Sequence, residues 1–361
     1  MKIRPFALER FFAKHEFSVK HLGCASDPDA LSLKELLALE PGAEEKFLAL
    51  GLGYGESVGR AELRQAIAAQ YKDIAPEDTL VHAGAEEAIF AFMNVLLSPG
   101  DHAIVHTPGY QSLYEVAEAA GASVTRWETR ESDGWQLDVD VLEELIKPET
   151  KLIVINSPHN PTGSVTTVMR LEAIVALARE KGIWVFSDEV YRGLEFGVPQ
   201  SKSMAELYER GVSLGATAKV YGLGGLRIGW LVCRDRELLE RIATFKDYLT
   251  ICSAGPSEFL AAIAVRNTEQ LAARTKKIVE ANVVRVQRLI DERPEEFSWI
   301  RPVAGTTGFV RYVPGGAEKW TNELLKEAGL LFLPGPIFDF ADTHFRIGLG
   351  RSALETWIHL V

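Results

Sequence analysis

The sequence predicts an α/β fold, with a large domain built on a mostly parallel sheet covered by helices on both faces and a smaller α+β domain after it. Between about residues 60 and 233, short strand-like runs alternate with helices of roughly 10–15 residues. The runs are continuous apolar or β-branched segments, as in a sheet that is buried on both faces. After residue 255 this alternation ends, which indicates the second domain.

Periodicity places the elements of the large domain. Helices with one apolar face are expected at 60–72, 86–97, 110–121, 139–147 and 168–182. Strands are expected at 79–84, 103–108, 123–129, 151–158, 183–190, 211–215 and 228–233. Proline and glycine separate these elements, since SPGD at 98–101 ends one helix and Gly121 ends the next.

A long helical stretch at 257–292 opens the second domain. Strands are expected at 297–300, 307–313, 330–335 and 344–350, with helices at 319–329 and 352–361. Residues 4–39 read as short helical pieces around an irregular stretch, HLGCASDPDA. We therefore expect an N-terminal arm at 1–40 that joins the small domain, a large domain at 41–255 and a small domain at 256–361.

Composition excludes several classes of protein. The chain has 361 residues, 47% hydrophobic and 25% charged, which is the balance of a globular protein and not of a disordered chain, a collagen or a coiled coil. A net charge of −11 argues against nucleic acid as a partner. The three cysteines are too scattered for a disulfide framework or a metal knuckle. No apolar run approaches the roughly 20 residues of a membrane helix. We expect a cytoplasmic protein without a membrane partner or a metal.

Two motifs suggest other functions and fail on their context. The glycines of LGLGYGES at 50–57 resemble a dinucleotide-binding loop, but they follow no expected strand, so a turn is the better interpretation. The segment GVSLG at 211–215 matches a hydrolase nucleophile motif on Ser213, with Asp342 and His344 later in the chain. That motif must lead directly into a helix, whereas here several glycines follow.

Four segments point to a single cofactor. In a parallel sheet, ligands bind at the carboxyl ends of the strands, and three of these segments directly follow expected strands. The four segments are SPHNPTG at 157–163, SDEVYRGLEF at 187–196, GATAKVYGLGGLRIGW at 215–230 and FRIGLG at 345–350. Their order and spacing resemble those of class I/II aminotransferases, which belong to the aspartate aminotransferase superfamily of fold type I pyridoxal-phosphate enzymes. The resemblance runs from about residue 30 to about residue 350.

The resemblance assigns the groups that handle the cofactor ring. Pyridoxal 5'-phosphate needs a lysine amine for a Schiff base and an anion beside its ring nitrogen. By resemblance, Lys219 forms the Schiff base, Asp188 pairs with the ring nitrogen, and Asn160 and Tyr191 donate to the ring hydroxyl. From the residues alone, Lys219 is also compatible with a solvated loop lysine, Asp188 with a helix cap and Asn160 with a turn before proline.

The resemblance also assigns the residues that would hold the phosphate and stack on the ring. Arg227 and the backbone N–H groups of Gly84, Ala85 and Glu86 would hold the phosphate, because a helix start is an anion site. Tyr110 would stack on the ring, although ordinary core packing is its alternative. Tyr54 would reach the phosphate of a neighbouring subunit, which implies a homodimer.

The substrate side of the site rests on three residues. Arg346 would clamp the substrate α-carboxylate, although as a strand residue it is also compatible with covering a sheet edge. Asn160 and Gly23 complete the expected substrate contacts.

The sequence departs from the family pattern next to the lysine. Relatives carry hydroxyl residues where this chain has Ala216 and Ala218. The phosphate would thereby lose hydrogen bonds worth about 1.5–3 kcal/mol each, unless Thr217 or Ser213 replaces them.

The expected function is transfer of an amino group between an L-amino acid and a 2-oxo acid. The nearest alternative is a β- or γ-eliminating lyase on the same fold, such as a carbon–sulfur lyase. An alternative outside enzymes, the ligand-sensing domain of a transcription regulator, would carry a basic winged-helix domain in front. Here the fold begins within about 40 residues of the start.

Overall fold

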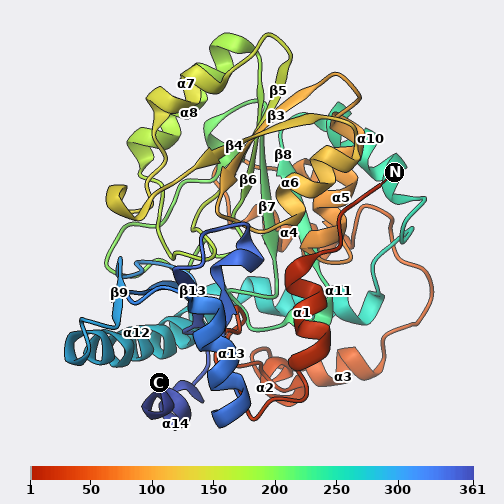
Figure 1. Cartoon of the computed structure of the whole chain (residues 1–361). Helices are drawn as coiled ribbons and strands as arrows, with labels where there is room; N and C mark the ends of the chain where they lie inside the picture. Colours follow the sequence, from red (N-terminus) through yellow and green to blue (C-terminus); the bar gives the residue numbers. More distant parts are fainter. Residues whose placement is uncertain (1) are drawn as a thin grey trace.

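The computed structural model describes residues 2–361 and contains a large central sheet with a smaller sheet beside it (Figure 1). The central sheet has seven strands in the order β2-β8-β7-β6-β5-β3-β4. The strands are β2 (Thr79–His82), β3 (His102–Thr107), β4 (Ser123–Glu128), β5 (Thr150–Asn156), β6 (Trp184–Asp188), β7 (Gly211–Ala216) and β8 (Gly229–Cys233). Strand β8 is antiparallel to both neighbours, while β3 to β7 pair in parallel. The predicted, mostly parallel sheet is confirmed.

Helices cover both faces of this sheet, as predicted. Figure 1 shows α7 and α8 on one side of the strands and α5, α6 and α10 on the other. The helices of the larger apolar core are α4 (Ala61–Ala68), α5 (Ala85–Leu96), α6 (Ser112–Ala119), α10 (Arg236–Lys246) and α11 (Gly255–Arg266). Those of the opposite face are α7 (Val139–Leu145), α8 (Val168–Lys181) and α9 (Met204–Leu207). Because both faces are buried, the strands carry apolar residues in continuous runs.

The small sheet is antiparallel and packs on a long helix. Its order is β12-β13-β10-β9, with β9 (Phe297–Trp299), β10 (Thr307–Tyr312), β12 (Leu333–Pro334) and β13 (His344–Gly348). Helix α12 (Thr268–Glu292) supplies valines and an isoleucine to the core of this domain, and α13 (Ala317–Ala328) and α14 (Leu354–Trp357) complete it. Short 3-10 helices are η1 (Pro76–Asp78), η2 (Glu131–Asp133), η3 (Gly224–Leu226), η4 (Gly335–Phe338) and η5 (Ile358–Leu360).

The helical stretch expected at 257–292 is confirmed, but it consists of two helices. The stretch is divided at Asn267 into α11, which ends at Arg266, and α12, which begins at Thr268. The Asn267 side chain donates to the Ile263 carbonyl at 2.8 Å. The Asn267 N–H is shared between the carbonyls of Ile263 and Ala264, at 3.2 and 3.0 Å. Its φ of −107° and ψ of 29° lie outside the helical region, so the backbone leaves α11 at this residue.

The N-terminal arm reaches the small domain. It contains α1 (Ala7–His15), β1 (His21–Leu22), α2 (Leu33–Leu37) and α3 (Ala43–Leu48). Strand β1 pairs in parallel with β11 (Leu330–Leu331), a contact that sequence reasoning missed because the strand has two residues. The three domain boundaries stay predictions.

Within residues 2–361, no helix combines the length and the apolar composition needed to cross a membrane.

Candidate active site

Three neighbouring strands bring the central residues together. Strands β5, β6 and β7 are adjacent and parallel, so the segments that follow them leave the same edge of the sheet. Asn160, Asp188 and Lys219 lie in or directly after these strands. Residues that are 59 positions apart in the chain, counting from Asn160 to Lys219, therefore share one site.

Asp188 is a buried carboxyl group at the end of β6. Its side chain is 5% exposed, and its Oδ1 accepts a hydrogen bond from the N–H of Val190 at 3.2 Å. Burial raises the pKa of Asp188 to about 6, and the positive charge of Lys219 opposes this rise. A buried carboxylate with so few partners suits a cation placed against it, such as a protonated ring nitrogen.

Asn156 is a positioning residue that sequence reasoning missed. Its Nδ2 donates to the carbonyls of Asp188 at 2.9 Å and Pro158 at 3.0 Å. Its Oδ1 accepts from the backbone N–H of Asn160 at 2.8 Å. One amide therefore connects the ends of β5 and β6. A polar residue at the end of the apolar run KLIVIN was the available signal.

Lys219 meets a residue of the N-terminal arm. Its Nζ donates to Ser26 Oγ at 2.8 Å and lies 5.9 Å from the centre of the Tyr191 ring. The Tyr191 hydroxyl donates weakly to the Ser26 carbonyl at 3.4 Å. The sequence offered no signal for Ser26, which lies in the irregular stretch of the arm.

Arg346 comes from β13 of the small domain and is 1% exposed. Its Nη1 donates to Asn160 Oδ1 at 3.2 Å, while Nε and Nη2 donate to the Cys24 carbonyl at 3.1 and 2.8 Å. Burial lowers the pKa of Arg346. The structure thus places a buried guanidinium beside Asn160. The edge of the guanidinium formed by Nε and Nη2 faces a backbone carbonyl of the arm.

Gly23 packs against the small domain, and its predicted substrate contact stays a prediction. Its N–H donates to the Leu331 carbonyl at 3.0 Å, and its carbonyl accepts from the N–H of Gly348 at 2.7 Å. A Cβ at this position would lie 2.7 Å from the Phe332 ring. Gly23 is therefore needed for close packing on the small domain, and both of its backbone groups are already used.

The start of α5 lies against Arg227. Gly84 has a φ of 95°, and a Cβ on it would overlap Nη2 of Arg227 and lie 3.0 Å from its Cζ. Arg227 is in the left-handed region with a φ of 54°. The Gly84 N–H donates to the His82 carbonyl at 2.8 Å, so this predicted phosphate donor is already engaged. The N–H groups of Ala85 and Glu86, beside the guanidinium, are the ones at this helix start that suit an anion such as a phosphate.

Glu86 and Tyr110 line the same side of the site. A Glu86 carboxylate oxygen accepts from the Ser112 hydroxyl, and burial raises the pKa of Glu86. The Tyr110 ring packs against Phe6 of the arm, with ring centres 5.0 Å apart. Burial raises the pKa of Tyr110 well above its usual value, so its hydroxyl keeps its proton.

Neither hydroxyl near Ala216 and Ala218 is free for a phosphate. Thr217 Oγ1 donates to the carbonyls of Leu223 and Ile228, both at 3.2 Å. Ser213 is fully buried, and its Oγ donates to Glu189 Oε1 at 2.7 Å. The structure therefore offers no substitute for the missing serines from these two residues, and it also removes Ser213 as a hydrolase nucleophile.

Within one chain, the Tyr54 side chain is open to solvent. It is 92% exposed, in a segment between α3 and α4. Its predicted role depends on a second subunit.

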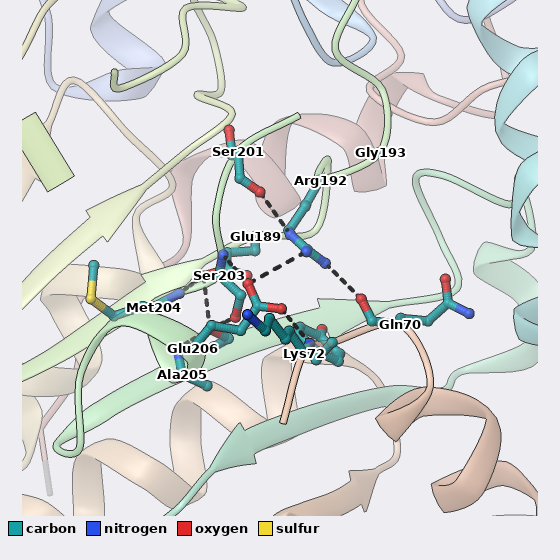
Figure 2. Close-up of polar contacts among 12 residues, drawn as sticks. Gln70, Lys72, Glu189, Arg192, Gly193, Ser201, Ser203, Met204, Ala205 and Glu206 are labelled. Atoms are coloured by element: carbon teal, nitrogen blue, oxygen red, sulfur yellow. Dashed lines mark hydrogen bonds and ion pairs between the residues drawn. The ribbon is translucent and has the colours of Figure 1, made fainter. Parts of the chain in front are cut away.

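A charged network supports the segment that carries Asp188 and Tyr191. Figure 2 shows Arg192 at its centre, where Nε donates to the Ser201 carbonyl at 2.9 Å and Nη2 lies 3.8 Å from Glu206. Glu189 accepts from the N–H of Met204 at 2.8 Å. Burial raises the pKa of Glu189 to about 7, and the Arg192 charge opposes this rise. The network holds the segment after β6 against the chain around Ser201 and Met204.

Comparison with known proteins identifies the family. The model of the family "Aminotransferase class I and II" matches residues 50–356. The chain belongs to this family. Capreomycidine synthase of Streptomyces vinaceus is 31% identical over 356 residues, which cover 96% of this chain and 90% of that protein. The predicted resemblance is confirmed.

Solved structures confirm the fold. A PLP-dependent aminotransferase from Streptococcus suis 89-1591 superposes with a TM-score of 0.93 at 32% identity and covers 100% of this chain and 98% of its own. The PLP-dependent cyclase OrfR superposes with a TM-score of 0.90 at 27% identity, covering 97% and 94%. The chain therefore has the fold type I architecture of PLP-dependent aminotransferases, and its family implies pyridoxal phosphate as the cofactor.

The residues present fit this cofactor. The lysine, the buried carboxyl and the amide that the cofactor requires lie on adjacent strands, and the absence of a Cβ at Gly84 lets Arg227 approach the helix start. Lys219, Asp188, Asn160 and Tyr191 would hold the ring, and Arg227 with the start of α5 would hold the phosphate.

Proposed function

We propose that this enzyme transfers an amino group between an L-amino acid and a 2-oxo acid, with Lys219 as the covalent attachment point of its cofactor. The observation that carries the proposal is the meeting of Lys219, Asp188 and Asn160 at one sheet edge, with the buried Arg346 donating to Asn160. Lys219 supplies a reactive amine and Asp188 a buried carboxylate. Arg346 supplies a clamp for the carboxylate of a substrate.

Each residue has a defined task in this proposal. Bound pyridoxal phosphate supplies an electron sink for the bonding electrons of the substrate Cα. Asp188 keeps a proton on the ring nitrogen, because a buried carboxylate is stabilised by a neighbouring cation. Lys219, once released by the substrate amine, takes the Cα proton at Nζ and acts as the general base.

Arg346 would bind the substrate α-carboxylate through two parallel hydrogen bonds. The edge formed by Nε and Nη2 now donates to the Cys24 carbonyl, which a carboxylate would have to replace. Asn160 holds the other edge, so the guanidinium plane is oriented before substrate arrives.

We further propose a homodimer in which Tyr54 completes the site of the partner. Large apolar side chains near Tyr54 in sequence are exposed, with Leu48 at 77% and Leu52 at 84%. Exposed apolar groups of this size are typical of a protein interface. The cytoplasmic location stays a prediction from the sequence.

A second candidate is a cyclisation on the same cofactor. Two relatives that span nearly the whole chain are named capreomycidine synthase and PLP-dependent cyclase OrfR. No relative named in these comparisons is a carbon–sulfur lyase, so elimination as the final reaction is not favoured.

A single-turnover panel separates these functions. The enzyme reconstituted with pyridoxal phosphate is mixed with each of the twenty protein amino acids, and the absorbance and the product masses are recorded. Transamination predicts a pyridoxamine spectrum and an oxo acid. A cyclic amino acid with the original cofactor spectrum would replace the first candidate by the second, and free ammonia with an oxo acid and the original spectrum would indicate elimination.

A further inference from the structure

The contact between Lys219 and Ser26 joins the reactive amine to the N-terminal arm. The two residues are 193 positions apart, and Nζ lies 2.8 Å from Ser26 Oγ. Within residues 2–361, Lys219 is the one side-chain hydrogen-bond partner of this hydroxyl. Ser26 is half-buried, so the contact is partly shielded from water.

The segment around Ser26 is held in place without the help of its side chain. We call residues 23–27 the arm strap. The Ser26 carbonyl accepts from Thr306 Oγ1 at 2.6 Å, and the Cys24 carbonyl accepts from Arg346. Arg351 pairs with Asp27 at 2.7 Å. These anchors use backbone carbonyls and the Asp27 carboxylate, so the Ser26 hydroxyl is left for Lys219.

Close packing also fixes the path of the arm strap. The N–H of Gly348 in β13 donates to the Gly23 carbonyl at 2.7 Å. A Cβ on Gly348 would overlap the carbonyl of Ala25, so the strap runs directly against this strand. Because the backbone is held on both sides of Ser26, its hydroxyl has a defined position relative to Nζ.

A lysine side chain has four rotatable bonds and loses substantial entropy when its amine is fixed. A hydrogen bond from Nζ to a fixed oxygen restricts the amine to a small region. When Nζ is neutral, donation of one N–H to an acceptor also orients its lone pair. A general base needs a fixed position and an oriented lone pair, since proton transfer depends on distance and alignment.

We propose that Ser26 is a positioning residue for Lys219, whose hydroxyl oxygen accepts a hydrogen bond from the free ε-amine and directs it toward the substrate Cα. This inference rests on the proposed function, in which Lys219 acts as the base.

The test compares three variants of the full chain. Ser26→Ala removes the hydroxyl and keeps the backbone anchors, and Ser26→Thr keeps a hydroxyl. Ser18→Ala is the matched control, because Ser18 lies on the same arm and its hydroxyl contacts the exposed carbonyls of Lys14 and His15. Borohydride reduction of each holoenzyme, followed by peptide mapping, first establishes that Lys219 carries the cofactor.

Two measurements then report on the amine. Exchange of the Cα proton is followed by NMR in D₂O with each of the twenty protein amino acids, and Ser26→Ala should slow it about tenfold. Ser26→Thr should stay within about threefold of the native rate, and Ser18→Ala should leave it unchanged. In the cofactor-free protein, ¹³C relaxation of the Lys219 Cε should show greater motion in Ser26→Ala alone.

The two proposals fail differently. Native enzyme without a borohydride label on Lys219 would overturn the proposed function. A label on Lys219 together with native exchange rates and native Cε relaxation in Ser26→Ala would overturn the role of Ser26. Equal slowing in Ser26→Thr and Ser26→Ala would overturn it too, because the hydroxyl would then not be responsible.

Discussion

Gly84 and Arg227 are in contact, such that a Cβ on Gly84 would overlap the guanidinium of Arg227. Gly84 precedes α5, and Arg227 precedes β8, which runs antiparallel to its neighbours. Because of this direction, the start of β8 lies at the same edge as the ends of the parallel strands. The helix start and the guanidinium therefore lie together, as the proposed phosphate site requires.

Gly84→Ala should weaken pyridoxal phosphate binding more than tenfold, because the new methyl group displaces Arg227 and the φ of 95° strains alanine. Binding of pyridoxal, which lacks the phosphate, should change little. Absorbance titrations of the cofactor-free protein with both compounds measure this difference. Gly51→Ala is the control, since nothing lies within 4 Å of a Cβ there. An equal loss for both compounds would contradict a local effect on the phosphate.

Asp188→Asn should stabilise the cofactor-free protein at pH 8. The folded pKa is raised from 3.8 to about 6, so the stabilising effect of the protonated carboxyl is complete below pH 3.8 and is lost as the pH rises through about 6. Asparagine cannot ionise, so the variant should gain about 1–3 kcal/mol at pH 8 and nothing below pH 4. Urea unfolding between pH 4 and 8 measures the difference.

The exposed Asp140→Asn is the matched control and should show no such pH dependence. A gain from Asp188→Asn that stays constant over this pH range would show that the Asp188 charge is not the cause. The same variant should also bind pyridoxal phosphate more weakly, because the anion beside the ring nitrogen is gone.

Lys219 should carry the cofactor in the reconstituted enzyme. Reduction with borohydride converts the Schiff base into a stable bond, and peptide mass mapping should then locate the pyridoxyl group on Lys219. Lys219→Ala should remain unlabelled. A pyridoxyl group on any other lysine would remove the basis of the active-site assignment.

The chain should form a homodimer whose sites include Tyr54 of the partner subunit. Light scattering at micromolar concentration should give about twice the 39.9 kDa of one chain. Tyr54→Phe should keep that mass and weaken pyridoxal phosphate binding by about tenfold through the lost hydroxyl. A fully active monomer would exclude Tyr54 from the site.

Ala218→Ser should tighten binding of pyridoxamine phosphate more than binding of pyridoxal phosphate. The nearby hydroxyls of Thr217 and Ser213 are already engaged, so a new serine adds a phosphate donor worth up to about tenfold in affinity. The covalent bond to Lys219 masks part of this gain for the aldehyde form. Equilibrium dialysis of both forms measures the change. Unchanged affinities would mean that another donor already serves the phosphate.

The elements of the large domain were readable from the sequence because their signals are local. Buried parallel strands need continuous apolar runs, and the helices between them need one apolar face. Lys219, Asp188 and Asn160 could be singled out as candidates because they lie at or after the ends of such strands within specific motifs. The division of the helical stretch at Asn267 was missed, since only one residue leaves the helical conformation there and helices continue on both sides of it.

The sequence by itself determined the succession of strands and helices of the large domain along the chain, and it singled out candidate residues at the carboxyl ends of the parallel strands. The tertiary structure alone decided that both backbone groups of Gly23 are hydrogen-bonded to the small domain, that Asn156 connects two strand ends and that Ser26 contacts Lys219. The physical reason is the separation along the chain of the residues that interact. A periodic pattern reports which face of a segment is buried, whereas a contact between residues 193 positions apart depends on how two packed domains bring the arm against the sheet edge.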